Sequence, residues 1–179
     1  MAVSCNSGNG DSSKNDSTGP KMADEQNDKK MEASNVDNDA DFAVFAADGG
    51  MAEVMIGNLA ATNSTNTAVK DLAAMIVKDH TAANEELKTA AQKMNITLPA
   101  TVSTDHQKKY DELAAKKGTD FDKAFIDAME DGHKKTIDKF QAEADNGKNA
   151  TLKAWAASKL PTLKQHLQMV EQTKDGMKK

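Results

Sequence analysis

Apolar residues recur at intervals of three and four positions from about Asp39 to Lys174. This spacing places them along one side of an α-helix and is typical of amphipathic helices that pack together. The aromatic content of only 4% argues against a β-sandwich, which usually contains more β-branched and aromatic residues. The sequence therefore predicts an all-α fold.

Turn residues divide this region into four long helices and one short helix. We expect the long helices at about 39–62, 67–94, 119–146 and 149–173, and the short helix at about 103–117. Short links join the long helices within each pair, whereas a longer segment that contains the short helix connects the two pairs. This order predicts a four-helix bundle over residues 38–176, in which two helical hairpins are joined by a crossover helix.

The N-terminal residues 1–37 differ sharply in composition. Most of them are Ser, Asn, Asp, Gly and Lys, which bury too little apolar surface to offset the entropy of ordering. The small residues Ala2, Val3 and Ser4 before Cys5 resemble the end of a bacterial lipoprotein signal, in which the cysteine becomes lipidated. We expect a disordered tether with a lipid on Cys5; the alternative is an unmodified thiol on an unstructured tail.

Charge and hydropathy limit the partners of the chain. The net charge is −5 and the lysines alternate with acids, so the sequence has no basic footprint for nucleic acid. No stretch approaches the ~20 apolar residues of a membrane-spanning helix, so we expect a soluble chain that meets the membrane only through its lipid. Homo-oligomer formation is left open, and the sequence identifies no protein partner.

One ionisable residue falls near the middle of each predicted long helix, on its apolar side. These residues are Glu53, His80, His133 and His166. A residue at the middle of a helix stays near the middle of a bundle whichever way the helix runs, so the four side chains should lie at one level. Buried carboxylates and imidazoles are costly unless they are paired or bind a metal. The sequence therefore predicts a central metal site.

The ligand types indicate which metal such a site would hold. Three imidazoles and one carboxylate suit Zn²⁺, or Fe²⁺ or Mn²⁺ with water, and Cu⁺ is less favoured. Asp79, Asn84 and Glu130 are expected to support the ligands through hydrogen bonds. A di-iron enzyme would need two Glu-x-x-His motifs, but only Glu130 to His133 has this spacing. A mononuclear site is therefore preferred, and no catalytic residue is assigned.

A metal-free interpretation of the same residues remains open. Buried polar side chains can also form a hydrogen-bond network that fixes how helices pack. The chain would then be a structural or protein-interaction module of the cell envelope. The fourth histidine, His106, lies in the predicted crossover and is expected to be solvated.

Several short motifs resemble one bacterial family over about residues 41–171. They are Gly49-Gly50-Met51-Ala52-Glu53, Asp79-His80 with Asn84-Glu85-Glu86-Leu87, Leu98-Pro99, Phe121-Asp122, Met129 with His133, Leu160-Pro161-Thr162-Leu163, and His166-Leu167. In these motifs the chain resembles domain of unknown function family 4142, a group of ferritin-like bacterial envelope proteins. The resemblance implies a ferritin-like fold and export to the periplasm or outer membrane. It implies no activity.

Together these observations predict a lipid-anchored envelope protein that binds a transition metal for storage, buffering or redox protection.

Overall fold

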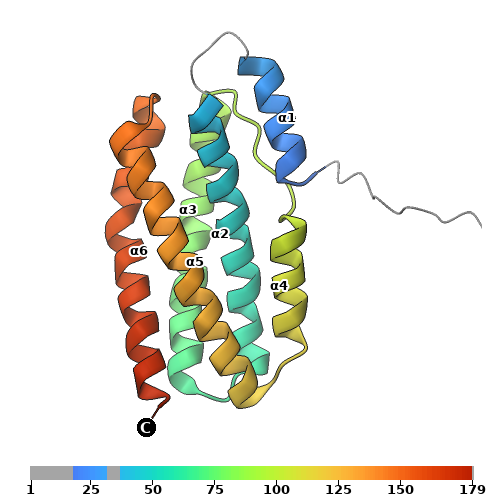
Figure 1. Ribbon diagram of the computed structural model, residues 1–179, viewed down its shortest axis with the longest axis vertical. Coiled ribbons are helices and arrows are strands. Elements are labelled where there is room, and N and C mark those ends of the chain that lie inside the picture. The colour runs from blue at the N-terminus through green and yellow to red at the C-terminus, as the bar shows by residue number, and fades with distance from the viewer. Residues whose placement is uncertain (1–17, 32–36, 179) are drawn as a thin grey trace, which may run out of the picture.

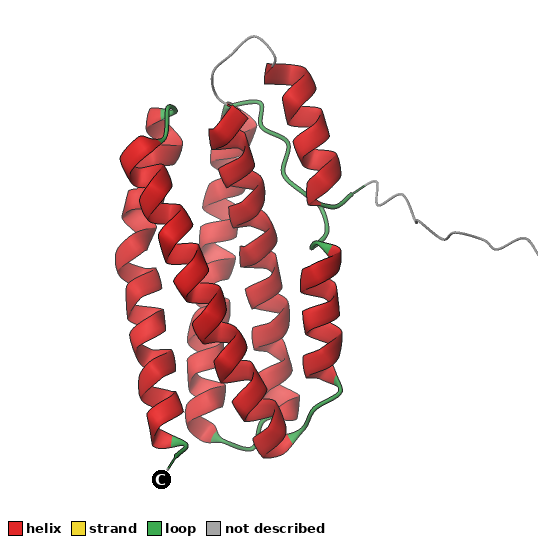
Figure 2. Ribbon diagram, in the orientation of Figure 1, coloured by secondary structure: helices red, strands yellow, loops and turns green. Residues whose placement is uncertain are grey.

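The structure is a computed structural model that describes residues 18–31 and 37–178. Within these segments all regular structure is helical (Figure 2), which confirms the prediction of an all-α fold. The six helices are α1 (Pro20–Met31), α2 (Asp37–Asn63), α3 (Thr67–Lys93), α4 (Thr104–Ala114), α5 (Gly118–Asn146) and α6 (Ala150–Gly176). The predicted helix boundaries agree to within a few residues.

The four long helices run alongside one another for most of the length of the molecule (Figure 1). Helix α2 packs against α3 and α5, while α6 packs against α5 and α3. The short helix α4 lies against α2 and α5, and α1 lies against α2. The segment between α3 and α5, which includes α4, therefore runs from the pair α2 and α3 to the pair α5 and α6.

Polar residues define the ends of α3. The Asn66 side chain accepts a hydrogen bond from the backbone N–H of Ala68 and caps the first turn. At the other end Asn95 has a φ of 57°, and the N–H of Ile96 donates to the carbonyl of Ala91 at 2.9 Å. This left-handed turn satisfies carbonyls at the end of the helix and redirects the chain. Helix length, and so the level of mid-helix residues, is fixed by these turns.

Helix α1 lies inside the range 1–37 for which the sequence predicted a disordered tether. Ala23 is buried against the rest of the molecule, and Asn27 is also buried. The Asn27 amide both donates to the carbonyl of Thr97, at 2.9 Å, and accepts from its N–H, at 2.7 Å. Hydrogen bonds to one distant backbone segment thus hold a helix that has little apolar surface.

The hydrophobic interior consists of two clusters, which we call upper and lower after the ends of the long helices in Figure 1 that contribute to them. The upper cluster contains Phe42, Leu87, Phe140, Leu152 and Leu163 among others. The lower cluster contains Leu72, Ile76, Phe121, Phe125, Ile126 and Val170 among others. Each long helix contributes to both clusters, so its middle lies where they meet.

Helix α2 is unusually apolar. Residues Asn38–Asn63 are long and apolar enough to cross a membrane by length and composition alone, whereas the sequence pattern predicted no helix of this kind. However, 56% of its most apolar window is buried inside the molecule, where α2 contacts α1, α3, α4 and α5. These contacts account for the composition of α2 as that of a central core helix.

Asp39 at the start of α2 holds the link between α5 and α6. Its buried carboxylate accepts hydrogen bonds from the backbone N–H groups of Lys148, at 3.0 Å, and Asn149. Because hydrogen bonds to a charged group contribute about 1.5–3 kcal/mol, Asp39→Ala should lower the free energy of unfolding by about 2 kcal/mol. Urea denaturation measures this change, and the exposed Asp138→Ala is the control. Equal stability of the two variants would contradict the assigned role.

Glu143, near the end of α5, should make stability depend on pH. Burial, with Asp39 nearby, raises its pKa from 4.5 to about 7 although Lys153 opposes this. Between these values the unfolded chain releases a proton that the folded chain retains, so stability falls as pH rises from 4.5 to 7. After allowance for solvent screening, Glu143→Gln should stabilise the protein by about 1 kcal/mol at pH 8. It should have little effect at pH 4, and thermal melts at both pH values test this.

Candidate metal centre

The four long helices each place one ionisable side chain between the upper and lower clusters. Glu53 on α2 lies between the buried Ala46 and Ile56, and the other helices repeat this arrangement. The exposed fractions are 7% for Glu53, 8% for His80, 0% for His133 and 1% for His166. We call these four residues the polar layer. The structure thus brings together the four side chains that the sequence predicted to lie at one level.

Glu53 connects two of the histidines. Its Oε2 atom lies 2.9 Å from His80 Nε2, and its Oε1 atom lies 3.4 Å from His133 Nδ1. The contact with His80 is short but poorly aligned, so the buried Nε2 atom makes no well-formed hydrogen bond. The carboxylate is therefore shared between α3 and α5, and one imidazole nitrogen remains incompletely satisfied.

The ring of His133 has a defined orientation. Its Nδ1 atom lies 2.9 Å from the carbonyl oxygen of Met129, one turn earlier on α5. A carbonyl oxygen only accepts hydrogen bonds, so we assign the hydrogen of a neutral His133 to Nδ1. The lone pair is then on Nε2, which points toward His166.

The same argument applies to His166. Its Nε2 atom lies 3.1 Å from Asp79 Oδ2, so the hydrogen of a neutral His166 belongs on Nε2. Its Nδ1 atom then carries the lone pair and lies 3.3 Å from His133 Nε2. Two neutral imidazoles held in this way direct their lone pairs at each other.

The third imidazole completes a triangle. The ring centroid of His80 lies 5.6 Å from that of His133 and 5.4 Å from that of His166. One ring nitrogen from each of the three histidines lies within 4.8 Å of the other two. Binding of one ion by all three would require the rings to move closer together, because nitrogen ligands around a tetrahedral ion lie about 3.3 Å apart.

Burial and neighbouring charges shift the pKa values in opposite directions. Burial alone would raise the pKa of Glu53, but attraction to His80 and His133 outweighs it and lowers that pKa to about 2. Burial opposes the charge on His80, yet Glu53 raises its pKa. Burial lowers the pKa of His133 and of His166, and the proximity of His80 adds to this. Without a metal, the layer thus favours an ion pair between Glu53 and His80 beside two neutral imidazoles.

The residues expected to support the ligands lie in different places. Asp79 reaches the layer, but its partner is His166 on α6 and not the adjacent His80. Asn84 packs so closely on α2 that a Cβ atom added to Gly50 would lie 2.1 Å from its Oδ1. Glu130 forms ion pairs with Lys134, at 2.5 Å, and Lys174, at 2.6 Å. Its expected support of His133 was therefore wrong, because these lysines hold its carboxylate instead.

His106 also differs from the expectation. It is partly exposed, and its Nδ1 atom lies 2.9 Å from Asp48 Oδ2 on α2. The other Asp48 oxygen accepts a hydrogen bond from the N–H of Ser103 at 2.7 Å. His106 therefore helps to attach the start of α4 to α2, away from the polar layer. Cys5, the predicted lipidation site, lies outside the described residues.

Comparison with known proteins gives one match. The family model described as "Domain of unknown function (DUF4142)" matches residues 22–173, which confirms the resemblance noted from the sequence motifs. No curated protein and no solved structure matches the chain significantly. Since the family description names no activity, the chemistry must be inferred from the geometry of the polar layer.

Proposed function

We propose that this chain, which belongs to the domain of unknown function family DUF4142, binds one transition-metal ion in its polar layer. His80, His133 and His166 would supply three nitrogen ligands, and Glu53 would supply an oxygen ligand. Zn²⁺, Fe²⁺ and Mn²⁺ suit this ligand set, whereas Cu⁺ prefers softer ligands.

The contact between His133 Nε2 and His166 Nδ1 carries this proposal. Met129 and Asp79 accept the hydrogens on the far sides of the two rings, so lone pairs face each other at 3.3 Å in a buried space. Such an arrangement is repulsive unless a positive species lies between the nitrogens. A metal ion meets this need without disturbing either outer hydrogen bond.

The spacing fits a metal as well. Two nitrogen ligands at about 2.0–2.1 Å from a tetrahedral ion lie about 3.3 Å apart, which is close to the separation observed here. Outer partners such as the Met129 carbonyl and the Asp79 carboxylate are those that usually orient metal-binding histidines. The Glu53 carboxylate would offset part of the charge of the ion.

One ion per chain favours some roles over others. A single buried site stores little metal for a chain of 179 residues, so buffering or redox protection fits better than bulk storage. We assign no catalytic step.

The test is a titration of the tag-free, full-length, metal-free protein with Zn²⁺, Co²⁺, Fe²⁺, Mn²⁺ and Cu⁺. We expect one ion per chain and a rise in melting temperature, because a ligand at 100 times its Kd stabilises the folded state by about 2.7 kcal/mol. A Cys5→Ser chain, which lacks the only thiol, should bind equally. If no ion binds or raises the melting temperature, the proposal is wrong.

A metal-free role is supported by a different contact. The 2.9 Å approach of Glu53 to His80, with the pKa of Glu53 lowered to about 2, indicates a buried ion pair that could fix helix packing by itself. A proton shared by His133 and His166 would then replace the metal. Under this alternative, a chelator leaves the melting temperature of the protein as isolated unchanged.

Two finer features of the proposal come from the sequence. The order of two long hairpins joined through α4 supports a ferritin-like bundle.

We also propose that Cys5 carries a lipid that anchors the protein in the bacterial cell envelope, in the periplasm or at the outer membrane. Mass spectrometry of protein from the membrane fraction should detect the acyl mass on Cys5, and Cys5→Ser should release the chain from membranes.

A further inference from the structure

Two hollows on different sides of the molecule border the polar layer, and a much smaller void of about 30 Å³ also borders Glu53 and His80. A hollow of about 200 Å³ between α3 and α6 ends on His80 and His166. A groove of about 520 Å³ between α2, α4 and α5 ends on Glu53. An ion therefore has two candidate routes to the layer, and the residues along them differ.

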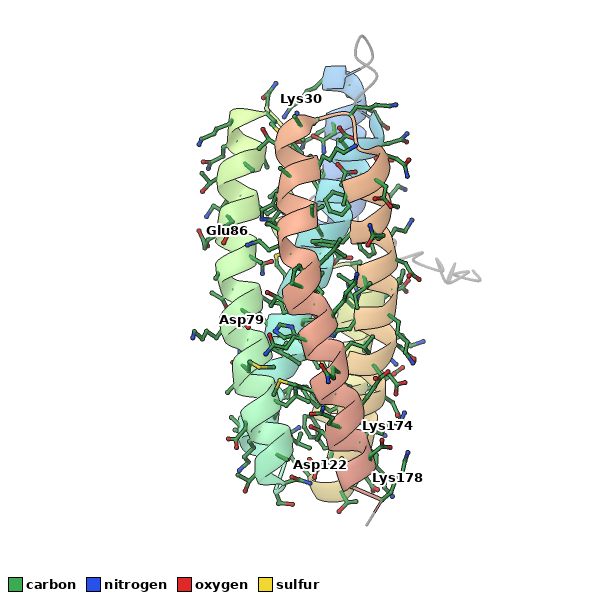
Figure 3. All side chains as sticks on the ribbon, turned by 90° about the vertical axis from the view of Figure 1, so that its left-hand side faces the viewer. Lys30, Asp79, Glu86, Asp122, Lys174 and Lys178 are labelled. Carbon is green, nitrogen blue, oxygen red and sulfur yellow. The ribbon has the colours of Figure 1, made fainter. Side chains whose placement is uncertain are left out.

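Asp79 links the hollow to the layer. It lies on α3 near mid-height, on the side that faces α6 (Figure 3), and its side chain is 36% exposed. Its Oδ2 atom lies 3.1 Å from His166 Nε2, while the other nitrogen of that ring lies 3.3 Å from His133. One carboxylate and one imidazole thus connect solvent to the buried nitrogens.

The charges in the hollow favour a cation. Lys159 forms an ion pair with Glu86, so the charge of this lysine is largely matched. Among the described residues no lysine forms an ion pair with Asp79; its carboxylate contacts His166 and is 36% exposed, so it presents a negative charge to the hollow. Oriented carboxylates at the mouth of a cleft raise the local concentration of cations.

The groove on the other side is less suited to this task. Its end is the Glu53 carboxylate, which already contacts His80 and His133. Lys109 and Lys135 both line the groove and place positive charge beside its acidic residues; the Lys135 Nζ atom lies 5.7 Å from the centre of the Phe45 ring. Besides Glu53, the acidic residues of the groove are Asp105, Asp127 and Asp131, of which Asp127 already forms an ion pair with Lys174 at 2.7 Å.

We propose that the hollow between α3 and α6 is the route by which the metal ion reaches and leaves the polar layer, and that Asp79 draws the ion into it. This inference rests on the proposed function. Asp79 is a positioning residue in this view, because it attracts the ion and orients His166 without belonging to the ligand set.

A matched pair of variants separates the two routes. Ala82 lines the hollow and Ala128 lines the groove, so Ala82→Trp and Ala128→Trp introduce the same bulk on opposite sides. Stopped-flow binding of Co²⁺ to the metal-free full chain gives the rates. We expect Ala82→Trp to slow both association and dissociation by about tenfold with Kd nearly unchanged, because a blocked route alters rates and not the equilibrium. Ala128→Trp should behave as wild type.

Asp79→Asn tests the role of the charge. Asparagine can still accept the hydrogen bond from His166 but carries no charge. We expect the association rate to fall about tenfold and to lose most of its dependence on ionic strength, since steering by charge is screened by salt. A purely structural Asp79 would instead change Kd through faster dissociation and leave the association rate as it was.

The possible failures are distinguishable. If the wild-type chain binds no ion, both the proposed function and this inference are wrong. If it binds Co²⁺ but Ala82→Trp exchanges it at the wild-type rate, or Ala128→Trp is the slower variant, only the inference is wrong. Thr162→Trp blocks the hollow from α6 and replaces Ala82→Trp should the latter fail to fold.

Discussion

Replacing His133 by alanine should abolish metal binding. His133 is fully buried, and its Nε2 atom faces His166 Nδ1 at 3.3 Å. The alanine variant therefore lacks one proposed ligand, and His166 Nδ1 loses the nitrogen that faces it. Loss of a residue that merely supports a metal ligand typically weakens binding by about 10–100-fold, so loss of a ligand should weaken it by about 100-fold or more. Isothermal titration with Zn²⁺ measures the change.

Two controls make this result specific. His106→Ala removes the one histidine that lies away from the polar layer, where it contacts Asp48, and should leave Kd within about twofold of wild type. His133→Gln retains a polar side chain of moderate size, so a folding defect in the alanine variant can be separated from a loss of affinity. Wild-type affinity in both His133 variants would remove His133 from the ligand set.

Replacing Glu53 by glutamine should destabilise the metal-free protein strongly. Glu53 is the carboxylate that contacts both His80 and His133, and its removal leaves the charge on His80 buried without a partner. Breaking a buried ion pair from one side typically costs about 3–5 kcal/mol, and we expect a loss of this size at pH 6. Denaturant titration measures it, and the exposed Glu112→Gln is the matched control.

The pH dependence provides an independent check on the same pair. The pKa of Glu53 is lowered from 4.5 to about 2 in the folded chain. The contribution of Glu53 to the free energy of unfolding is therefore complete above pH 4.5 and is lost as the pH decreases toward 2. The pKa of His80 is raised above 6.5, so its contribution is complete below pH 6.5 and is lost at higher pH. The difference between wild type and Glu53→Gln should therefore be largest between pH 4.5 and 6.5. A difference that grew below pH 4 would contradict the ion pair.

The ligand set could be predicted from the sequence because helix register fixes the level of a residue. His80 and His133 interrupt apolar stripes near the centres of α3 and α5, and polar turns mark where these helices begin and end. Once the level of a residue along the bundle and the inward face of its helix are known, helix geometry alone predicts that such side chains converge. His166 lies at the corresponding position of α6, and the structure buries it.

Contacts between side chains on different helices could not be predicted in this way. Asp79 follows no apolar stripe, and its pairing with His166 depends on how α3 and α6 face each other. Glu130 has the spacing of a ligand motif, yet Lys174 at the far end of the chain determines where its carboxylate points. A periodic pattern on one helix contains no information about such partners.

Helix α1 was missed for a related reason. Its few apolar residues give no stripe, and its composition resembles that of disordered segments. Contacts with residues far away in the sequence hold it instead, among them the hydrogen bonds between the Asn27 amide and the backbone of Thr97, 70 positions away. The periodicity of apolar residues predicts which surface is buried, but it does not predict hydrogen bonds between a side chain and a distant backbone segment.

The division of the interior by Glu53 and the three histidines has a consequence for how the protein unfolds. Each long helix passes through this division without a break. However, the hydrophobic contacts between the helices form two separate blocks, one at each end of the molecule. We expect an ion at the junction to couple these blocks into one cooperative unit. In its absence, amide hydrogen exchange should show the two ends of the molecule opening with different free energies.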